Sequence, residues 1–242
     1  MRNVLPALFA AAVVATVAVV DSTPAQAQSS YPAQCAGGVV NLRFDDGPFE
    51  ETIPVLDALK QHKLKATFFV VGQQVLKYPQ ITQRIVRDGH QLANHSWSHT
   101  ALAELTPAAA SLELKYTQEI VRRVTGVTMK FAGPPYGSTN EVVRAEMAKL
   151  GLRETFKSQD SEDWDGAEPW QIMNKLSQVP PGGILLLHDW APAALTVIPD
   201  IAWYFNTYWK SSPICSGKLA NTTEVNPVME WPGMYYFAKA VK

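Results

Sequence analysis

Four groups of acidic and histidine side chains are the residues of this sequence best suited to chemistry. They are Asp45-Asp46 in "FDDGP", His95 and His99 in "HSWSH", Asp160 and Asp163 in "DSEDW", and His188-Asp189 in "LLLHD". Taken singly, each group has an ordinary explanation, such as a turn or a structural histidine. Adjacent carboxylates, however, repel each other unless a cation lies close to both. We therefore expect the acidic pair to have a cationic partner.

A metal ion would supply that cation. Two histidines with one carboxylate form a ligand set suited to Zn²⁺, with coordination positions left open. One carboxylate of the acidic pair would then bind the metal, and the other would take a proton from a water molecule whose pKa the metal lowers to about 7. His188 could protonate a leaving nitrogen or oxygen, and Asp163 could hold that imidazole charged. These residue types favour a metal-dependent hydrolase.

Apolar strands alternate with helical patterns from residue 39 onward. Strands are expected within residues 39–44, 66–71, 91–97, 129–137, 153–160 and 182–189, and helices at 52–63, 78–89, 106–126, 140–151, 169–179 and 194–208. This alternation predicts a parallel sheet, and about seven such units favour closure into a barrel. All four groups lie at strand ends, where barrel folds carry their reactive residues. Strict alternation would place Asp45 and Asp46 on opposite faces, so the Gly47-Pro48 turn must bend the chain.

Composition and charge narrow the class of protein. The 242 residues are 47% hydrophobic, carry a net charge of -1 and contain no basic run. This balance argues against nucleic acid or an anionic membrane surface as a partner. Seven Trp and eight Tyr suit either core packing, which composition alone favours, or a carbohydrate-facing cleft. The length fits a single domain, which we expect to be a monomer.

The N-terminus predicts secretion. Residues 1–27 combine Arg2, an apolar run and the Ala25-Gln26-Ala27 cleavage pattern of a signal peptide, so the mature domain would be 28–242. An uncleaved signal-anchor is the alternative. In an oxidising compartment Cys35 and Cys215 are expected to form a disulfide rather than two free thiols. The protein is therefore predicted to be extracellular, either free or associated with a cell wall.

The motifs "FDDGP", "HSWSH", "PPYG", "DSEDW" and "LLLHD", in this order, resemble those of the polysaccharide deacetylases of carbohydrate esterase family 4. The resemblance extends from Phe44 to Asp189. It implies an α/β fold, a distorted (β/α) barrel of about seven parallel strands in a single domain. It also implies removal of N-acetyl groups from chitin or its oligosaccharides, with Zn²⁺ or another divalent ion such as Co²⁺ as cofactor.

The resemblance also implies a role for each motif residue. It makes Asp45 the general base, Asp46, His95 and His99 the metal ligands, and His188 the general acid supported by Asp163. The backbone N–H of Tyr136 would serve the oxyanion, and Trp164, Leu186 and Pro135 would bind substrate. His62 and His90 join no group and are expected to be structural.

One motif departs from the family pattern. Position 133 normally carries an arginine that steers the catalytic aspartate, and here it is a glycine, while position 43, normally threonine, is Arg43. By the two-residue period of a strand, Arg43 lies on the same side as Asp45, about 6–7 Å away. We hypothesise that the guanidinium has moved to position 43 and still pairs with Asp45. The alternative is that Arg43 points elsewhere.

Two other functions remain open from the sequence. The same site could remove O-acetyl groups from acetylxylan. If Asp45 lacked its arginine partner, the protein could instead be a weakly active or non-catalytic carbohydrate-binding relative. Metal-dependent turnover separates this last class from both enzymes.

Overall fold

A computed structural model describes residues 38–207 and the backbone of 214–217. The predicted signal peptide and Cys35 lie outside these residues. Cys215 lies in a described strand whose side chains are not described, so the disulfide stays a prediction. None of the helices in the described ranges is long and apolar enough to span a bilayer.

The strands form one parallel sheet in the order β5-β4-β3-β2-β1-β7-β6, with β8 beside β1. Their bounds are β1 Gly38–Asp45, β2 Thr67–Val70, β3 Gln91–Asn94, β4 Phe131–Ala132, β5 Arg153–Glu154, β6 Gln159–Asp160, β7 Ile184–His188 and β8 Ile214–Gly217. All of the pairings between these strands are parallel. The seven strands of the main path form a curled, partly closed barrel, which confirms the predicted fold class.

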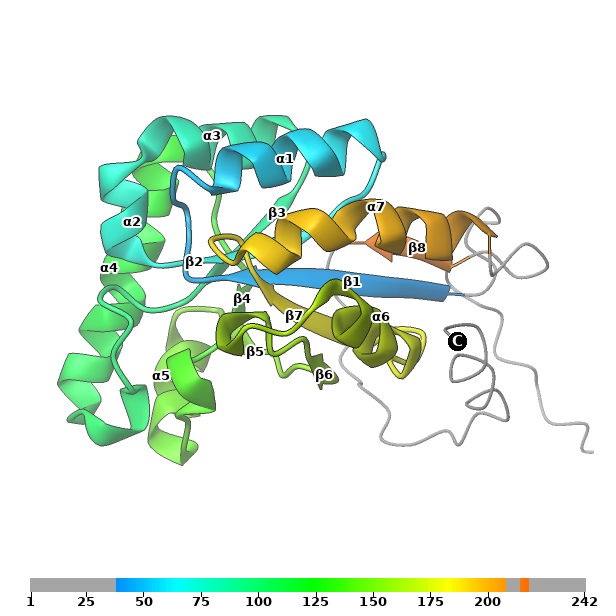
Figure 1. Ribbon diagram of the computed structural model, residues 1–242. Coiled ribbons are helices and arrows are strands. Elements are labelled where there is room, and N and C mark those ends of the chain that lie inside the picture. The colour runs from blue at the N-terminus through cyan, green and yellow to red at the C-terminus, as the bar shows by residue number, and fades with distance from the viewer. Residues whose placement is uncertain (1–37, 208–213, 218–242) are drawn as a thin grey trace, which may run out of the picture. The chain divides into compact units, whose positions relative to one another are not determined.

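Helices surround this sheet, as Figure 1 shows. The α-helices are α1 Thr52–Gln61, α2 Gly72–Lys77, α3 Pro79–Arg87, α4 Pro107–Thr125, α5 Glu141–Lys149, α6 Pro169–Ser177 and α7 Pro192–Thr207. Short 3₁₀ turns are η2 Leu102–Glu104, η3 Pro135–Gly137 and η4 Asp163–Asp165. Thr106 caps the start of α4, because its hydroxyl accepts a hydrogen bond from the Ala109 N–H. Gly126 ends that helix in a left-handed conformation that suits glycine.

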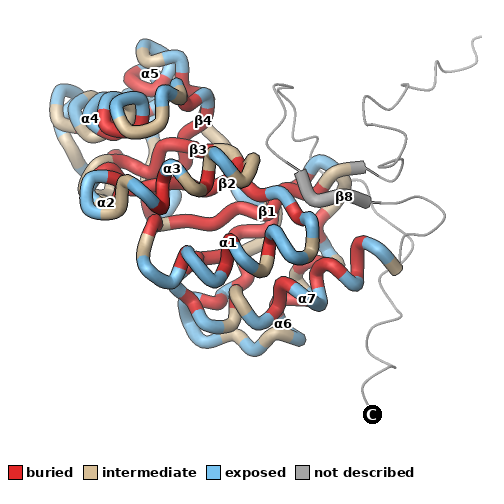
Figure 2. Tube along the Cα trace, turned by 90° about the horizontal axis from the view of Figure 1, so that it is seen from above, coloured by how far each residue is buried: buried red, intermediate tan, exposed pale blue. Residues whose placement is uncertain are grey.

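The core lies between the strands and the inner faces of the helices, which alternate between buried and exposed residues in Figure 2. On α1 the sequence pattern predicts an inner face of Ile53, Leu56 and Leu59. Leu56 and Leu59 are buried, but Ile53 is 40% exposed, and Thr52 and Val55 are buried instead. The Thr52 hydroxyl has a buried carboxylate partner, described below, which explains why a polar residue occupies the inner face.

Several strands are shorter than the sequence pattern predicts. β3 ends at Asn94 rather than at residue 97, because a loop with left-handed backbone at Ser96 and His99 begins there. The predicted strands within 129–137 and 153–160 shrink to the two-residue strands β4, β5 and β6. Shorter strands leave longer loops at their carboxyl ends, and these loops carry the polar motifs.

Candidate active site

The motif residues converge on one cavity of about 710 Å³ at the carboxyl ends of the strands. Its lining comprises Arg43, Asp45, Asp46, His95, His99, Pro134, Tyr136, Gly137, Thr155, Phe156, Lys157, Asp160, Trp164, Leu186, His188 and Trp190. Asp163 does not line the cavity but is buried and bonded to His188. All four groups that the sequence singles out therefore contribute to one site.

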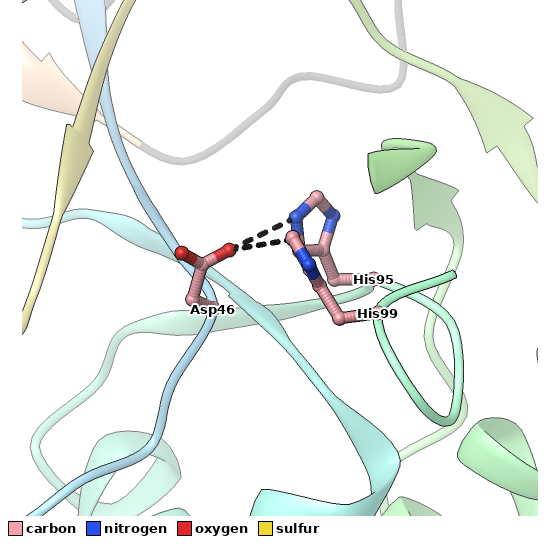
Figure 3. Close-up of side chains that lie close together, drawn as sticks. All are labelled: Asp46, His95 and His99. Atoms are coloured by element: carbon pink, nitrogen blue, oxygen red, sulfur yellow. Dashed lines mark ion pairs between the residues drawn. The ribbon is translucent and has the colours of Figure 1, made fainter. Parts of the chain in front are cut away.

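Asp46, His95 and His99 form a compact cluster in this cavity (Figure 3). One ligand atom from each lies within 4.8 Å of the other two. A single carboxylate oxygen, Oδ1 of Asp46, lies 3.0 Å from Nε2 of His99 and 3.4 Å from Nε2 of His95. Two imidazole nitrogens and one carboxylate oxygen facing a common point are the donor set of a transition-metal site.

The backbone at Asp46 explains how two adjacent carboxylates reach one cavity. Asp45 is the last residue of β1, and Asp46 has a φ of 78°. This left-handed conformation breaks the alternation of the strand, so that Asp46 turns back toward the side that Asp45 faces. The bend that the sequence places at Gly47-Pro48 thus begins one residue earlier. Non-glycine residues in this conformation carry strain, which is common at functional sites.

The protonation of His95 provides a test of whether a metal fits. Its Nδ1 contacts the carbonyl oxygen of Gly133, which can only accept, so Nδ1 must carry the proton. Nε2 then faces the Asp45 and Asp46 carboxylates, at 3.5 Å and 3.4 Å. A cation at this point, either a proton on Nε2 or a metal ion in its place, would stabilise the two carboxylates. A carbonyl on the far nitrogen is also how metal-binding histidines are usually oriented.

Asp46 is suited to act as an anionic ligand. Burial alone raises the pKa of its carboxyl group, but hydrogen bonds with His95 and His99 outweigh that effect. A further hydrogen bond from the Trp190 indole acts in the same direction, and the pKa of Asp46 lies well below its ordinary value.

Side chains outside the motifs hold the histidine loop. Glu113 of α4 accepts hydrogen bonds from the backbone N–H groups of Trp97 and Ser98, at 2.9 Å and 2.8 Å, and from the Ser98 hydroxyl. Asn94 accepts from the Ser96 N–H and donates to the Leu114 carbonyl. Sequence reasoning missed Glu113. Its position in a long amphipathic helix gives no local signal of a contact with the loop.

Arg43 makes the contact that the sequence analysis expects. Its Nε lies 2.7 Å from Oδ1 of Asp45, and its Nη2 lies 2.7 Å from Oδ2, a two-point ion pair in which both residues are buried. A Cβ placed on Gly133 would come within 2.3 Å of Nη2, so glycine leaves the space that the guanidinium occupies. Nη1 donates to the Thr155 carbonyl, and the guanidinium stacks on the Phe69 ring.

His188 lies beside Asp45, since the two residues are paired in the register of β1 and β7. Its Nδ1 lies 2.7 Å from Oδ1 of Asp163, and its backbone N–H donates to the other oxygen of that carboxylate. Burial lowers the pKa of His188, but the hydrogen bond and charge of Asp163 outweigh burial and raise it above the ordinary value. The imidazole can therefore hold a proton near neutral pH.

Three of the four residues proposed for the oxyanion and substrate line the cavity. Tyr136 has a φ of 59°, is 77% exposed, and its hydroxyl lies 3.1 Å from Nδ1 of His99. Trp164 and Leu186 also line the cavity. Pro135 does not: it is buried in η3, and its neighbour Pro134 faces the cavity instead.

Three further residues in or beside the motifs make contacts at the site, although the resemblance assigned none of them a role. Asp160 lines the cavity and is bound by the Lys157 ammonium at 2.5 Å, which holds the pKa of this carboxyl group below its ordinary value although burial raises it. Asp189 is buried under the turn at Gly47, and Trp190 donates to Asp46. His90 is buried against Phe68 and is structural, as expected.

Comparisons with known proteins agree with this geometry. The model of the family described as Polysaccharide deacetylase matches residues 33–155. A peptidoglycan-N-acetylglucosamine deacetylase of Bacillus cereus is 39% identical over 156 residues, which are 62% of this chain and 55% of that protein. A chitooligosaccharide deacetylase of Bradyrhizobium is 37% identical over 156 residues, 63% of this chain and 71% of that protein.

A solved structure from the same family has a similar fold. A family 4 carbohydrate esterase from Streptomyces lividans, solved in complex with acetate, superposes with a TM-score of 0.73 at 36% identity. That match covers 76% of this chain and 94% of the esterase. Matches to the curated relatives span 29% to 71% of their lengths, so the chain corresponds to only a part of most of them. By its matched sequence, its parallel sheet and its site, this chain belongs to the polysaccharide deacetylase family.

Proposed function

We propose that this protein hydrolyses the acetamide of N-acetylglucosamine residues in a β-1,4-linked glycan, with chitin oligosaccharides as the first candidate substrate. One observation carries the proposal. A carboxylate clamped by arginine, a His₂-Asp cluster and an imidazole with a raised pKa share one cavity. These are the groups that amide hydrolysis requires.

The chain's own groups divide the reaction between them. A divalent metal held by Asp46, His95 and His99 would polarise the acetyl carbonyl and lower the pKa of a water molecule. Asp45, held in place by Arg43, takes a proton from the attacking water. The backbone N–H of Tyr136 donates to the acetyl oxygen as it gains negative charge. When the C–N bond breaks, His188 gives its proton to the leaving nitrogen, and the products are acetate and a free amine.

The cavity walls suit a sugar polymer. Tyr136, Phe156, Trp164 and Trp190 line the cavity and are each at least 37% exposed. Exposed aromatic rings can stack on the C–H faces of sugar rings, and Leu186 with Trp164 would contact the acetyl methyl group. One relative above is named for N-acetylglucosamine in peptidoglycan, and the other is named for chitooligosaccharides, which are built from N-acetylglucosamine. The unit common to them is the substrate proposed here.

The alternatives differ in their support. Removal of O-acetyl groups from acetylxylan would use the same groups, and no feature of the cavity favours it. The non-catalytic alternative rested on Gly133, and it loses that support because Asp45 keeps a guanidinium partner. Secretion after removal of residues 1–27, and the Cys35–Cys215 disulfide, remain part of the proposal. Both can be checked by the intact mass of the mature protein.

The function is tested by measuring acetate released from a chitin pentasaccharide, from peptidoglycan fragments and from acetylxylan. Each assay is run before chelation, after chelation, and after adding back Zn²⁺ or Co²⁺. We expect release from N-acetylglucosamine substrates that stops on chelation and returns with metal. Asp46→Asn should reduce release by at least about 10²-fold, because a neutral amide replaces the anionic ligand and binds the metal more weakly. Asp200→Asn, at an exposed carboxylate of α7, is the matched control.

The substrate panel separates the alternatives. Release from acetylxylan alone would replace the proposed substrate class. If no substrate released acetate at any metal concentration, the proposal would be abandoned in favour of a carbohydrate-binding protein.

A further inference from the structure

Trp190 contacts two parts of the proposed catalytic site at once. Its indole Nε1–H donates to Oδ2 of Asp46 over 3.0 Å, across a sequence separation of 144 residues. Its ring lies beside His188, with the ring centroids 5.5 Å apart. The side chain lines the cavity and is 37% exposed. No family motif carried over from the sequence assigns this residue a role.

The hydrogen bond makes the two oxygens of Asp46 different. Oδ1 faces Nε2 of His99 and Nε2 of His95, as the dashed lines in Figure 3 show. Oδ2 accepts from Trp190. An indole N–H is a donor only and cannot itself bind a metal. It therefore engages Oδ2 in a hydrogen bond and leaves Oδ1 as the oxygen that faces the imidazoles.

The distinction matters because a carboxylate can bind a metal through one oxygen or two. A second carboxylate oxygen on the metal would occupy a coordination position that a water molecule or the acetyl oxygen needs. Hydrogen bonds to a ligand's outer atoms commonly fix its orientation and tune the site. The Trp190–Asp46 bond is placed to do this for the carboxylate of the cluster.

We propose that Trp190 is a positioning residue that holds Asp46 as a one-oxygen metal ligand and so keeps the neighbouring coordination positions open. This inference rests on the metal binding proposed above and does not depend on which glycan is the substrate. The contact between the Trp190 ring and His188 is a separate effect, which the test must distinguish from the effect of the hydrogen bond.

Trp190→Phe separates the two effects, because it keeps an aromatic ring beside His188 and removes the N–H. At a position that is 37% exposed, the variant is expected to fold. The matched control is Trp170→Phe, because Trp170 is 68% exposed on α6 and does not line the cavity. The first readout is the visible absorption of the Co²⁺-loaded protein, which reports coordination number without any turnover. The second is Zn²⁺ affinity by chelator competition.

In Trp190→Phe we expect weaker Co²⁺ absorption, as coordination number rises, together with a change of about 10- to 100-fold in Zn²⁺ affinity. Trp170→Phe should match the wild-type protein. An unchanged Co²⁺ spectrum and Zn²⁺ affinity in Trp190→Phe would overturn the inference, even if kcat fell, because the effect would then belong to His188 or the substrate. Wild-type protein that binds Co²⁺ but releases no acetate would defeat the proposed function and leave this inference to be judged from the spectra.

Discussion

Two buried ion pairs serve the cavity, one within β1 and one between η4 and β7, and they use their carboxylates in opposite ways. In the β1 pair, Arg43 donates hydrogen bonds to both oxygens of Asp45, so the cation fixes the position of the carboxylate. In the β7 pair, Asp163 binds both the ring and the backbone N–H of His188, so the anion holds the cation. Both pairs have a shortest N–O distance of 2.7 Å.

The difference matches the proposed roles, in which Asp45 accepts a proton and His188 donates one. Arginine stays protonated in proteins, so it can fix a base without competing for the proton. Histidine titrates near neutral pH, and a carboxylate beside it raises the pKa until the ring can act as an acid. The pairs also differ in how far apart their two residues lie in the sequence. Arg43 and Asp45 are two residues apart, whereas Asp163 and His188 are 25 apart. The first pair is therefore built by one strand, and the second needs the folded structure.

The largest effect is expected from breaking the β1 pair. Arg43→Ala leaves the Asp45 carboxylate buried without its guanidinium, which should lower the free energy of unfolding by about 3–5 kcal/mol. Acetate release should fall by at least about 10²-fold, because the base is no longer held in place. Arg43→Lys keeps the charge but not the two-point contact and should retain an intermediate activity. Activity in Arg43→Ala equal to that of the wild type would refute a catalytic role for the pair.

A double variant tests whether the arginine has moved between strands. Arg43→Thr with Gly133→Arg restores the residues that the family usually carries at both positions. We expect the activity of the double variant to be at least about tenfold higher than that of Arg43→Thr alone. Gly133→Arg alone should be poorly active, because its side chain would overlap the guanidinium of Arg43. If the double variant is no better than Arg43→Thr, the two positions are not interchangeable.

The same contrast between local and distant contacts explains what the sequence could predict. Arg43 and Asp45 share a strand face, so the two-residue period alone predicts their contact. The four polar groups were expected to converge because parallel strands place their carboxyl ends together, and they do line or support one cavity. The fold class followed from the alternation of strand and helix patterns.

What the sequence could not predict depends on distant contacts or on backbone conformation. Trp190 meets Asp46 across 144 residues, and Glu113 meets the histidine loop from a different helix. Neither contact leaves a periodic signal. The left-handed backbone of Asp46 moves the bend from the Gly-Pro turn to the residue before it. The tight turn of η3 likewise buries Pro135 and turns Pro134 to the cavity.

The next largest effect is expected from weakening the β7 pair. Asp163→Asn keeps acceptor capacity but removes the charge that raises the pKa of His188. Because the protonated ring is the proposed acid, activity is lost as pH rises through the pKa of His188. This pKa should be lower in the variant, so its alkaline loss of activity should begin at a lower pH than in the wild type. Activity at the optimum should fall roughly tenfold or more. The pH dependence of kcat is the measurement. Asp165→Asn, an exposed residue of the same 3₁₀ turn, is the control.

The two pairs should respond differently to pH. Arg43→Lys should leave the alkaline side of the pH profile where it is in the wild type, since lysine stays charged there. If Asp163→Asn lowered activity without moving the alkaline side of the profile, Asp163 would act by holding the ring in position rather than through its charge.

The smallest effect on activity is expected at Asp189, which connects the end of β7 to the turn that follows β1. It follows His188 in sequence, and its carboxyl group packs against Gly47 and accepts a 2.6 Å hydrogen bond from Thr52. Thr52 in turn accepts from the Phe49 N–H, so this contact fixes the turn after Asp46. Burial, with the nearby charge of Asp46 adding to it, raises the pKa of Asp189 from an ordinary value of 3.8 to about 7, although the Thr52 hydrogen bond opposes the rise.

A raised carboxyl pKa means that the folded state binds the proton more tightly than the unfolded chain does. The contribution of Asp189 to stability is therefore complete below about pH 4 and is lost as pH rises to about 7, by up to about 4 kcal/mol at 1.36 kcal/mol per pKa unit. Asp189→Asn keeps an acceptor for Thr52 and has no charge to bury. The free energy of unfolding in urea, measured from pH 4.5 to 8 with Asp200→Asn as control, should fall less steeply in this variant than in the wild type, with kcat little changed. Parallel pH curves for the two proteins would show that Asp189 ionises as readily in the folded protein as in the unfolded chain, and the link between β7 and the turn after β1 would then be one of packing alone.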